Sequence, residues 1–417
     1  MSFRLNIPKA EAYRLYLLGM GFAAFAMTLA YTVHLVYQVK QVGLNPLQLV
    51  LIGATLELTA LLTEIPTGVV ADVYSRRLSI IVGFLFLGFS LILEGSFPVF
   101  EALLLGQVFA GLGYTFLSGA TTAWIVDEIG LERAGKAFLR GAQVEQVFAF
   151  CGIFVSVALA SVSLQLAIVC GGVLLVALAA FLALFMPETG FQRRPASDRE
   201  SWRMFLSTFR GGFALVRARQ ILLLITVAAI IHGAFSEGFD RLWISHLLEN
   251  FSLPPLGQFD EIMWFGIISA VSMPLTLAAT ELLRRRLDMT DGPQIAYTLI
   301  GVYALLIVSV LLFILADIFA LALLGLWLTG AARAIRNPLM EAWINQHTES
   351  GVRATVLSIQ GQADALGQIA GGPLVGAVGL LSSVRVAISL SALLLLPILP
   401  VFRGAVKVTR RSEQDPD

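Results

Sequence analysis

The sequence predicts an all-α membrane protein with twelve transmembrane helices in two pseudo-symmetric six-helix halves. Apolar residues make up 57% of its 417 residues, and a helix needs about 20 of them to cross a hydrocarbon core about 30 Å thick. Short charged breaks separate the apolar runs, and one longer break divides them into two sets of six. A soluble domain would not contain so many long apolar runs.

Each of the twelve apolar runs is long enough to form one span. They cover residues 13–38, 47–70, 78–96, 99–126, 137–160, 164–186, 220–248, 261–283, 293–314, 318–343, 354–379 and 384–402. The first run is too long for the core of a cleaved signal peptide, so it is expected to remain as an anchor.

Basic residues predict the orientation, because Lys and Arg in short loops stay on the cytoplasmic side during insertion. With the N-terminus inside, only Lys40 and Arg385 of the 28 Lys and Arg lie outside, apart from three arginines within spans. Both termini are therefore expected in the cytoplasm, in a multi-pass protein of the plasma (inner) cell membrane.

The longest break is rich in arginine and separates the two halves. We expect a first half over residues 1–186, a cytoplasmic linker over 187–219, a second half over 220–404 and a cytoplasmic tail over 405–417. Apolar residues recur at helical spacing in the linker between Trp202 and Val216. This pattern indicates an amphipathic helix at the membrane interface, and a partly ordered basic linker is the alternative.

An internal repeat supports the division into halves. Ala123-Trp124-Ile125 recurs as Ala342-Trp343-Ile344, and the same offset carries Glu145 onto Asp364. Parallel six-helix repeats are an architecture of secondary transporters, in which the substrate site lies between the halves near the bilayer midplane.

A short charged segment follows the second span. Its distinctive residues are Gly68, Asp72, Arg76 and Arg77. The segment resembles the signature of the major facilitator superfamily, Gly-x-Leu-Ala-Asp-Arg-x-Gly-Arg-Lys, with Val73 and Ser75 where the family has arginine and glycine. The resemblance extends over the whole chain in topology. It implies a transporter that works by alternating access, with these four residues as its cytoplasmic gate.

Two further positions bear on the type of transport. Gln107 stands where the fourth helix of the family often carries an arginine linked to proton coupling, and the fifth span has Cys151-Gly152 without the proline of the antiporter signature. The resemblance to the drug and metabolite efflux branch implies an antiporter, and these departures leave a facilitator or a proton symporter open.

Ionisable side chains inside spans cost about 2.5 to 3.5 kcal/mol each on insertion scales, so their positions indicate function. The candidates for coupling or substrate contact are Glu57, Glu145, Asp364, Arg333, Glu237 and Arg241. A membrane-buried carboxylate can exchange a proton near neutral pH, because desolvation disfavours its charged form. A structural role is the alternative for each of these residues.

Similar depth in the membrane predicts that Arg333 pairs with Asp364 on the next span. Arg336 is expected to extend to the lipid headgroups. Glu237 and Arg241 stand four residues apart on one helical face and are expected to pair.

The composition argues against an enzyme and against a metal or organic cofactor. The chain has four histidines, none of them at ligand spacing with acids or cysteines, and it has no phosphate-binding loop of the ATPase type. Lone histidines such as His34 and His232 are expected to be satisfied packing residues. The net charge of zero does not suggest a nucleic acid partner.

The leading hypothesis is proton-coupled efflux of a small organic or amphipathic compound. The alternatives are a metabolite facilitator or proton symporter and, in another class, a membrane receptor that does not transport. The expected partners are the substrate, protons and the lipid bilayer, and one chain is expected to suffice as a monomer.

Overall fold

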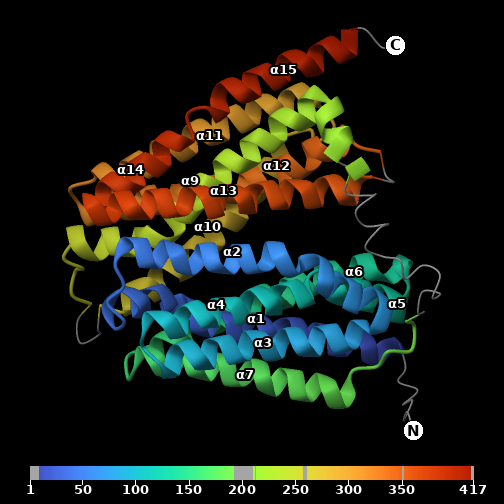
Figure 1. Ribbon diagram of the computed structural model, residues 1–417, viewed down its shortest axis with the longest axis vertical. Coiled ribbons are helices and arrows are strands. Elements are labelled where there is room, and N and C mark those ends of the chain that lie inside the picture. The colour runs from blue at the N-terminus through green and yellow to red at the C-terminus, as the bar shows by residue number, and fades with distance from the viewer. Residues whose placement is uncertain (1–8, 192–209, 212, 257–260, 350–351, 415–417) are drawn as a thin grey trace. The chain divides into compact units, whose positions relative to one another are not determined.

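The computed structural model describes residues 9–191, 210–211, 213–256, 261–349 and 352–414 (Figure 1). Within these residues, twelve helical segments are long and apolar enough to cross a membrane. The predicted number and order of spans are confirmed. The limits differ mainly where a helix extends beyond its apolar run, as in the fifth span, which begins at Leu131 rather than at residue 137.

The chain forms two compact units. The first contains the described parts of residues 1–44, 55–201 and 255–269, and the second contains those of 45–54, 202–254 and 270–417. The division expected within residues 187–219 stays a prediction. The segment from Trp202 to Phe209 lies outside the described residues, and residues 213–218 are helical.

Six spans in chain order precede the linker. Their helices are α1 (Lys9–Lys40), α2 (Pro46–Val69) with the π-helical turn η1 (Val70–Tyr74), α3 (Arg76–Ser96), α4 (Phe100–Leu117) with α5 (Ala120–Ile129), α6 (Leu131–Ala160) and α7 (Leu164–Phe185). Gly119 has a φ of 70° between α4 and α5. This left-handed conformation suits glycine and interrupts the fourth span.

Six further spans follow the linker. Their helices are α9 (Gln220–Asn250), α10 (Met263–Arg286), α11 (Gly292–Leu315), α12 (Phe319–Gln346), α13 (Arg353–Leu381), and α14 (Val384–Leu394) with α15 (Ile398–Gln414). The boundaries between the two units fall inside α2 and α10. Residues 45–54, which include the start of α2, belong to the second unit, and residues 255–269, which include the start of α10, belong to the first.

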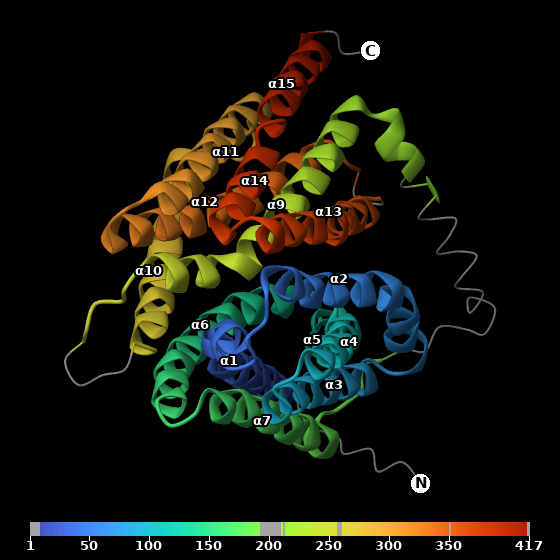
Figure 2. The ribbon, with the colours of Figure 1, turned by 60° about the vertical axis from the view of Figure 1, so that its left-hand side comes forward.

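Corresponding helices make corresponding contacts in the two units. In the first, α1 packs against α6 and α7, and α3 packs against α4 and α7. In the second, α9 packs against α13 and α14, and α11 packs against α12 and α15. Figures 1 and 2 show these neighbours side by side within each unit. This agreement is what the internal repeat predicts.

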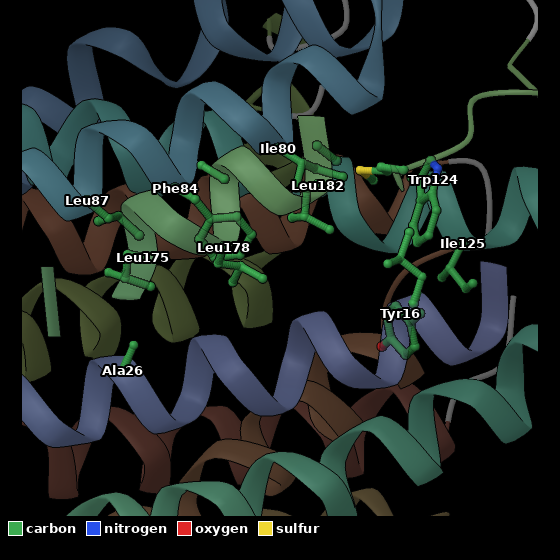
Figure 3. Close-up of a cluster of buried hydrophobic side chains, with 14 of the residues drawn as sticks. Tyr16, Ala26, Ile80, Phe84, Leu87, Trp124, Ile125, Leu175, Leu178 and Leu182 are labelled. Carbon is green, nitrogen blue, oxygen red and sulfur yellow. The ribbon is translucent and has the colours of Figure 1, made fainter. Parts of the chain in front are cut away.

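The core of the first unit lies among α1, α3, α5 and α7 (Figure 3). Phe84 and Leu87 of α3 meet Leu175 and Leu178 of α7 in this buried cluster. Two glycines allow the close approach of α3 and α7. A Cβ atom added at Gly88 would lie 2.8 Å from the Gly172 carbonyl oxygen, and one at Gly172 would lie 2.7 Å from that of Gly88. Small residues at such contacts let membrane helices pack closely.

Candidate functional site

Charged and polar side chains from four helices gather inside the second unit. We call this group the arginine cluster. It consists of His232 and Asp240 of α9, Tyr303 of α11, Arg333 and Arg336 of α12, and Asp364 and Gln368 of α13. It contains two of the predicted candidates, Arg333 and Asp364.

Arg333 binds Asp240 rather than Asp364. Its two terminal nitrogens donate to the two carboxylate oxygens of Asp240, with Nη2···Oδ2 at 2.7 Å. The expected pairing of Arg333 with Asp364 is therefore wrong. Depth alone suggested it, and depth does not say which neighbouring helix an arginine faces. A two-pronged ion pair of this kind fixes the orientation of both groups.

Arg336, rather than Arg333, forms the ion-pair contact with Asp364. Its Nε donates to the Tyr303 hydroxyl at 3.0 Å, and its Nη2 lies 3.9 Å from Oδ1 of Asp364. Its side chain is only 14% exposed, so the expectation that it extends to the headgroups is also wrong. Tyr303 and Asp364 supply partners within the unit, and the guanidinium remains among them.

The carboxylate of Asp364 is hydrogen-bonded through one of its two oxygens only, among the described residues. Its Oδ2 accepts a hydrogen bond from Gln368 Nε2 at 2.9 Å, while its buried Oδ1 has no hydrogen-bond partner among the described residues. The imidazole Nδ1 of His232 is also buried without such a partner, and the ring packs edge-on against Tyr303. His232 is thus a packing residue as expected, but it is not a satisfied one. An unpaired buried polar atom is costly and calls for an explanation.

The predicted pair of Glu237 and Arg241 is confirmed, with Arg241 Nε donating to Glu237 Oε1 at 3.1 Å. Two glycines lie beside this ion pair. A Cβ added at Gly53 would overlap this carboxylate, and one added at Gly372 would lie 2.7 Å from Cγ of Glu237. The pair therefore fills space left by two glycines, and this close packing favours a structural role.

Two other candidates belong to the first unit. Glu145 lies partly buried on α6, close enough to Tyr16 of α1 for an electrostatic interaction, and has no hydrogen bond or ion pair with another described residue. Glu57 lies partly buried on α2. Since α6 packs on α1 and α13 packs on α9, Glu145 and Asp364 occupy corresponding helices of their units.

The charged segment after α2 is anchored within the first unit. Arg76 forms an ion pair with Asp127 and donates to the Ala123 carbonyl at 2.8 Å. The Arg77 backbone N–H donates to Glu188 at 2.9 Å. The sequence alone does not indicate either partner acid, because both lie far along the chain at the ends of other elements.

The remaining positions of this segment have different surroundings. Asp72 is exposed and makes no hydrogen bond or ion pair with another described residue, and a Cβ added at Gly68 would meet nothing within 4 Å. At an offset of 209 residues, the sequence aligns Asp72 with Glu281. Glu281 lies near the end of α10 and binds Arg284 and Arg285 of its own helix. The motif acid therefore stays available for a partner, whereas its counterpart is paired locally.

The fold, the repeated packing and the charged segment define a membrane transporter. Comparison with known proteins identifies its family. The family model of the Major Facilitator Superfamily matches residues 15–302, and the chain belongs to this family. Its members are transporters rather than enzymes, in agreement with the composition. The predicted family, fold class and multi-pass membrane nature are confirmed.

One relative and two solved structures are similar over most of the chain. The uncharacterized MFS-type transporter YxaM of Bacillus subtilis (strain 168) is 23% identical over 363 residues, which cover 85% of this chain and 86% of that protein. The crystal structure of the nucleoside transporter NupG has a TM-score of 0.73 at 15% identity, and the match covers 95% of this chain and 99% of that one.

A bacterial homolog of the human lysosomal transporter Spinster, in an inward-facing and unoccupied conformation, has a TM-score of 0.73 at 14% identity. The match covers 96% of this chain and 97% of that one. At these identities the solved structures show a common fold, and they leave the substrate to be inferred from the site.

Proposed function

We propose that the protein is a proton-coupled secondary transporter that exports a small organic or amphipathic compound by alternating access, with Asp364 as its coupling acid. One observation carries this proposal. The Oδ1 atom of Asp364 is buried, yet it has no hydrogen-bond partner among the described residues. A carboxylate oxygen in that state can take up a proton without first breaking a hydrogen bond, and its ion-pair contact with Arg336 is long, at 3.9 Å.

The other acids of the second unit suit this role less well. Asp240 is engaged by Arg333 through both oxygens, and Glu237 is bonded to Arg241 beside glycine backbone. Protonating either acid would remove its ion pair with an arginine, which is costly at a partly buried site. Arg336, at 3.9 Å from Asp364, keeps its bond to Tyr303 in either protonation state of Asp364.

A small organic substrate is supported by the chemistry of the arginine cluster. It contains two arginines and two aspartates, so its charges balance, together with hydroxyl and amide groups that can bond a polar solute. The similar solved structures include a nucleoside transporter and a POT family transporter in complex with 5-aminolevulinic acid, both of which concern small organic compounds.

The orientation and the gate complete the proposal. The protein lies in the plasma or inner membrane with both termini in the cytoplasm. Asp72, which the structure leaves exposed, takes a partner there when the transporter changes state, while Arg76 keeps the segment attached to Asp127.

The test uses the full-length protein in liposomes that contain a pH-sensitive dye. Ethidium and radiolabelled uridine serve as probes, each with and without an imposed pH gradient. For the wild type we expect gradient-driven movement of at least one probe. For Asp364→Asn we expect that movement to fall at least about tenfold, a change of about 1.4 kcal/mol, while exchange of the same probe without a gradient persists.

The matched control is Glu349→Gln, because Glu349 is an exposed acid with a long contact to Arg219 at 3.5 Å. It should behave like the wild type. An undiminished response to the gradient in Asp364→Asn would contradict the assignment of the coupling acid. Probe movement that ignores the gradient in the wild type would identify a facilitator, and uptake with the proton gradient would identify a symporter.

A further inference from the structure

A second buried polar group lies in the first unit and shares no residue with the arginine cluster. It comes from three helices, and we call it the glutamate cluster. Its members are His34, Tyr37 and Gln38 of α1, Ser90 and Glu94 of α3, and Gln107 of α4. All six side chains belong to buried residues. Nothing in the sequence marks Glu94 as a site residue, because it lies near the end of its span.

The carboxylate of Glu94 is the centre of this cluster. Its Oε2 lies 2.7 Å from Nε2 of His34, and its Oε1 accepts hydrogen bonds from Ser90 Oγ at 3.0 Å and from Gln107 Nε2 at 2.8 Å. The Tyr37 hydroxyl donates to the Glu94 backbone carbonyl at 2.7 Å. The side chain of Glu94 is 0% exposed.

The chain leaves room for this carboxylate at one glycine. A Cβ atom added at Gly106 of α4 would lie 2.5 Å from Oε1 of Glu94, so the carboxylate rests against the helix backbone. The next residue, Gln107, stands where the family often has an arginine. A neutral amide therefore binds Glu94 where a permanent positive charge would otherwise be available.

The charges of the cluster follow from its members. No Lys or Arg among the described residues is bonded to it, and His34 is its one possible cation. The other titratable groups that face it are tyrosines of α1: Tyr37, and Tyr31, whose ring lies edge-on to His34. From α7, the neutral Gln165 contacts Tyr37.

A buried carboxylate with no cation is strongly unfavourable. One proton makes the cluster neutral in total charge, either as an imidazolium beside a carboxylate or as an imidazole beside a carboxylic acid. The 2.7 Å contact between Nε2 and Oε2 suits both arrangements, because one hydrogen lies between the two atoms in either case.

We propose that the glutamate cluster is a buried proton-binding site, in which His34 and Glu94 share one exchangeable proton. Gln38 supports this assignment. Its Nε2 lies 3.5 Å from Nε2 of His34, and its Oε1 has no partner among the described residues. Turning this amide over would exchange a donor for an acceptor beside the histidine, so Gln38 can adapt to either state of the ring.

The inference goes beyond the proposed function, because it places a proton in the first unit and does not depend on Asp364. A purely structural bond between His34 and Glu94 would also stabilise the three helices. The two roles differ in one measurable respect. A purely structural pair keeps its shared proton throughout the pH range in which the protein is folded, whereas a proton-binding site gains and loses the proton within that range.

The experiment is a pH titration of full-length protein in lipid nanodiscs, followed by NMR of histidine labelled with carbon-13 at Cε1. The chain has four histidines, and the signal lost in His34→Gln identifies His34. We expect this signal to titrate in the wild type. In Glu94→Gln we expect the proton affinity of His34 to fall at least tenfold, which is one pH unit, because the anion that stabilises the imidazolium is gone.

Ser90→Ala provides a second test of the proposal in case Glu94→Gln does not fold. It removes one donor from the carboxylate, so the proton affinity of the cluster should rise. The His246 signal, from the second unit, should be unchanged in both variants. A His34 signal that does not titrate in the wild type, or that titrates identically in the variants, would overturn the proposal. The readout needs no substrate, so this outcome leaves the test of Asp364 unaffected.

Discussion

At the residue scale, partners decide what each charged side chain in the membrane can do. Asp240 and Asp364 are the same residue type in the same cluster, yet Asp240 is engaged through both oxygens while Asp364 leaves one buried oxygen without a hydrogen bond. Their difference comes from Arg333, which faces one and not the other. This difference is the reason why the coupling role is proposed for Asp364 and not for Asp240.

Gly53 provides a residue-scale prediction. Gly53→Ala should destabilise the protein, because the new Cβ would overlap Glu237 and crowd Arg241. Overpacking of this kind costs about 1–3 kcal/mol. Thermal unfolding in detergent measures the effect as a lowered melting temperature.

Gly301→Ala is the matched control for Gly53→Ala. A Cβ at Gly301 would meet nothing within 4 Å, and alanine is favoured over glycine inside a helix by about 0.5–1 kcal/mol. Its melting temperature should equal or exceed that of the wild type. Equal stability of both variants would show that the carboxylate does not rest against Gly53.

At the scale of elements, the start of α3 explains why this chain has a serine where the family signature has glycine. Ser75 accepts a hydrogen bond from the Leu78 N–H at 2.9 Å and so caps the helix, and it donates to the Glu188 carboxylate at 2.8 Å. One hydroxyl thus joins the end of η1, the start of α3 and the chain after α7. A serine in this position both caps the helix and attaches it.

Ser75→Ala should lower stability by about 1 kcal/mol for the lost cap and by about 1 kcal/mol more for the lost bond to Glu188. Ser383→Ala is the comparison, because Ser383 caps α14 by accepting from Val386 and has no carboxylate partner in the described structure. Unfolding in detergent should show the larger loss for Ser75→Ala. A loss no greater than that of Ser383→Ala would mean that Glu188 adds nothing.

At the scale of the whole molecule, the distribution of Lys and Arg predicts that both termini are cytoplasmic. In a variant without Cys151 and Cys170, a single cysteine at Ser2 or at Ser412 should resist a membrane-impermeant maleimide in intact cells and react after lysis. A cysteine at Gln41, which is exposed between α1 and α2, should react from outside. Labelling of the termini in intact cells would reverse the orientation.

The sequence by itself determined the class of protein, the twelve spans and the repeat. These features depend on long apolar runs, on spacing and on short charged breaks, all of which are properties of neighbouring residues along the chain. The pair of Glu237 and Arg241 was predictable for the same reason, since four residues place both side chains on one face of a helix.

Only the tertiary structure decided which charges meet. Arg333 could face either neighbouring helix, and the rotation of α12 brings it to Asp240 while Arg336 faces Asp364. Glu94 near the end of one span became notable once α1 and α4 brought His34 and Gln107 to it. Contacts between helices depend on helix rotation and close packing, which composition and spacing within one helix do not specify.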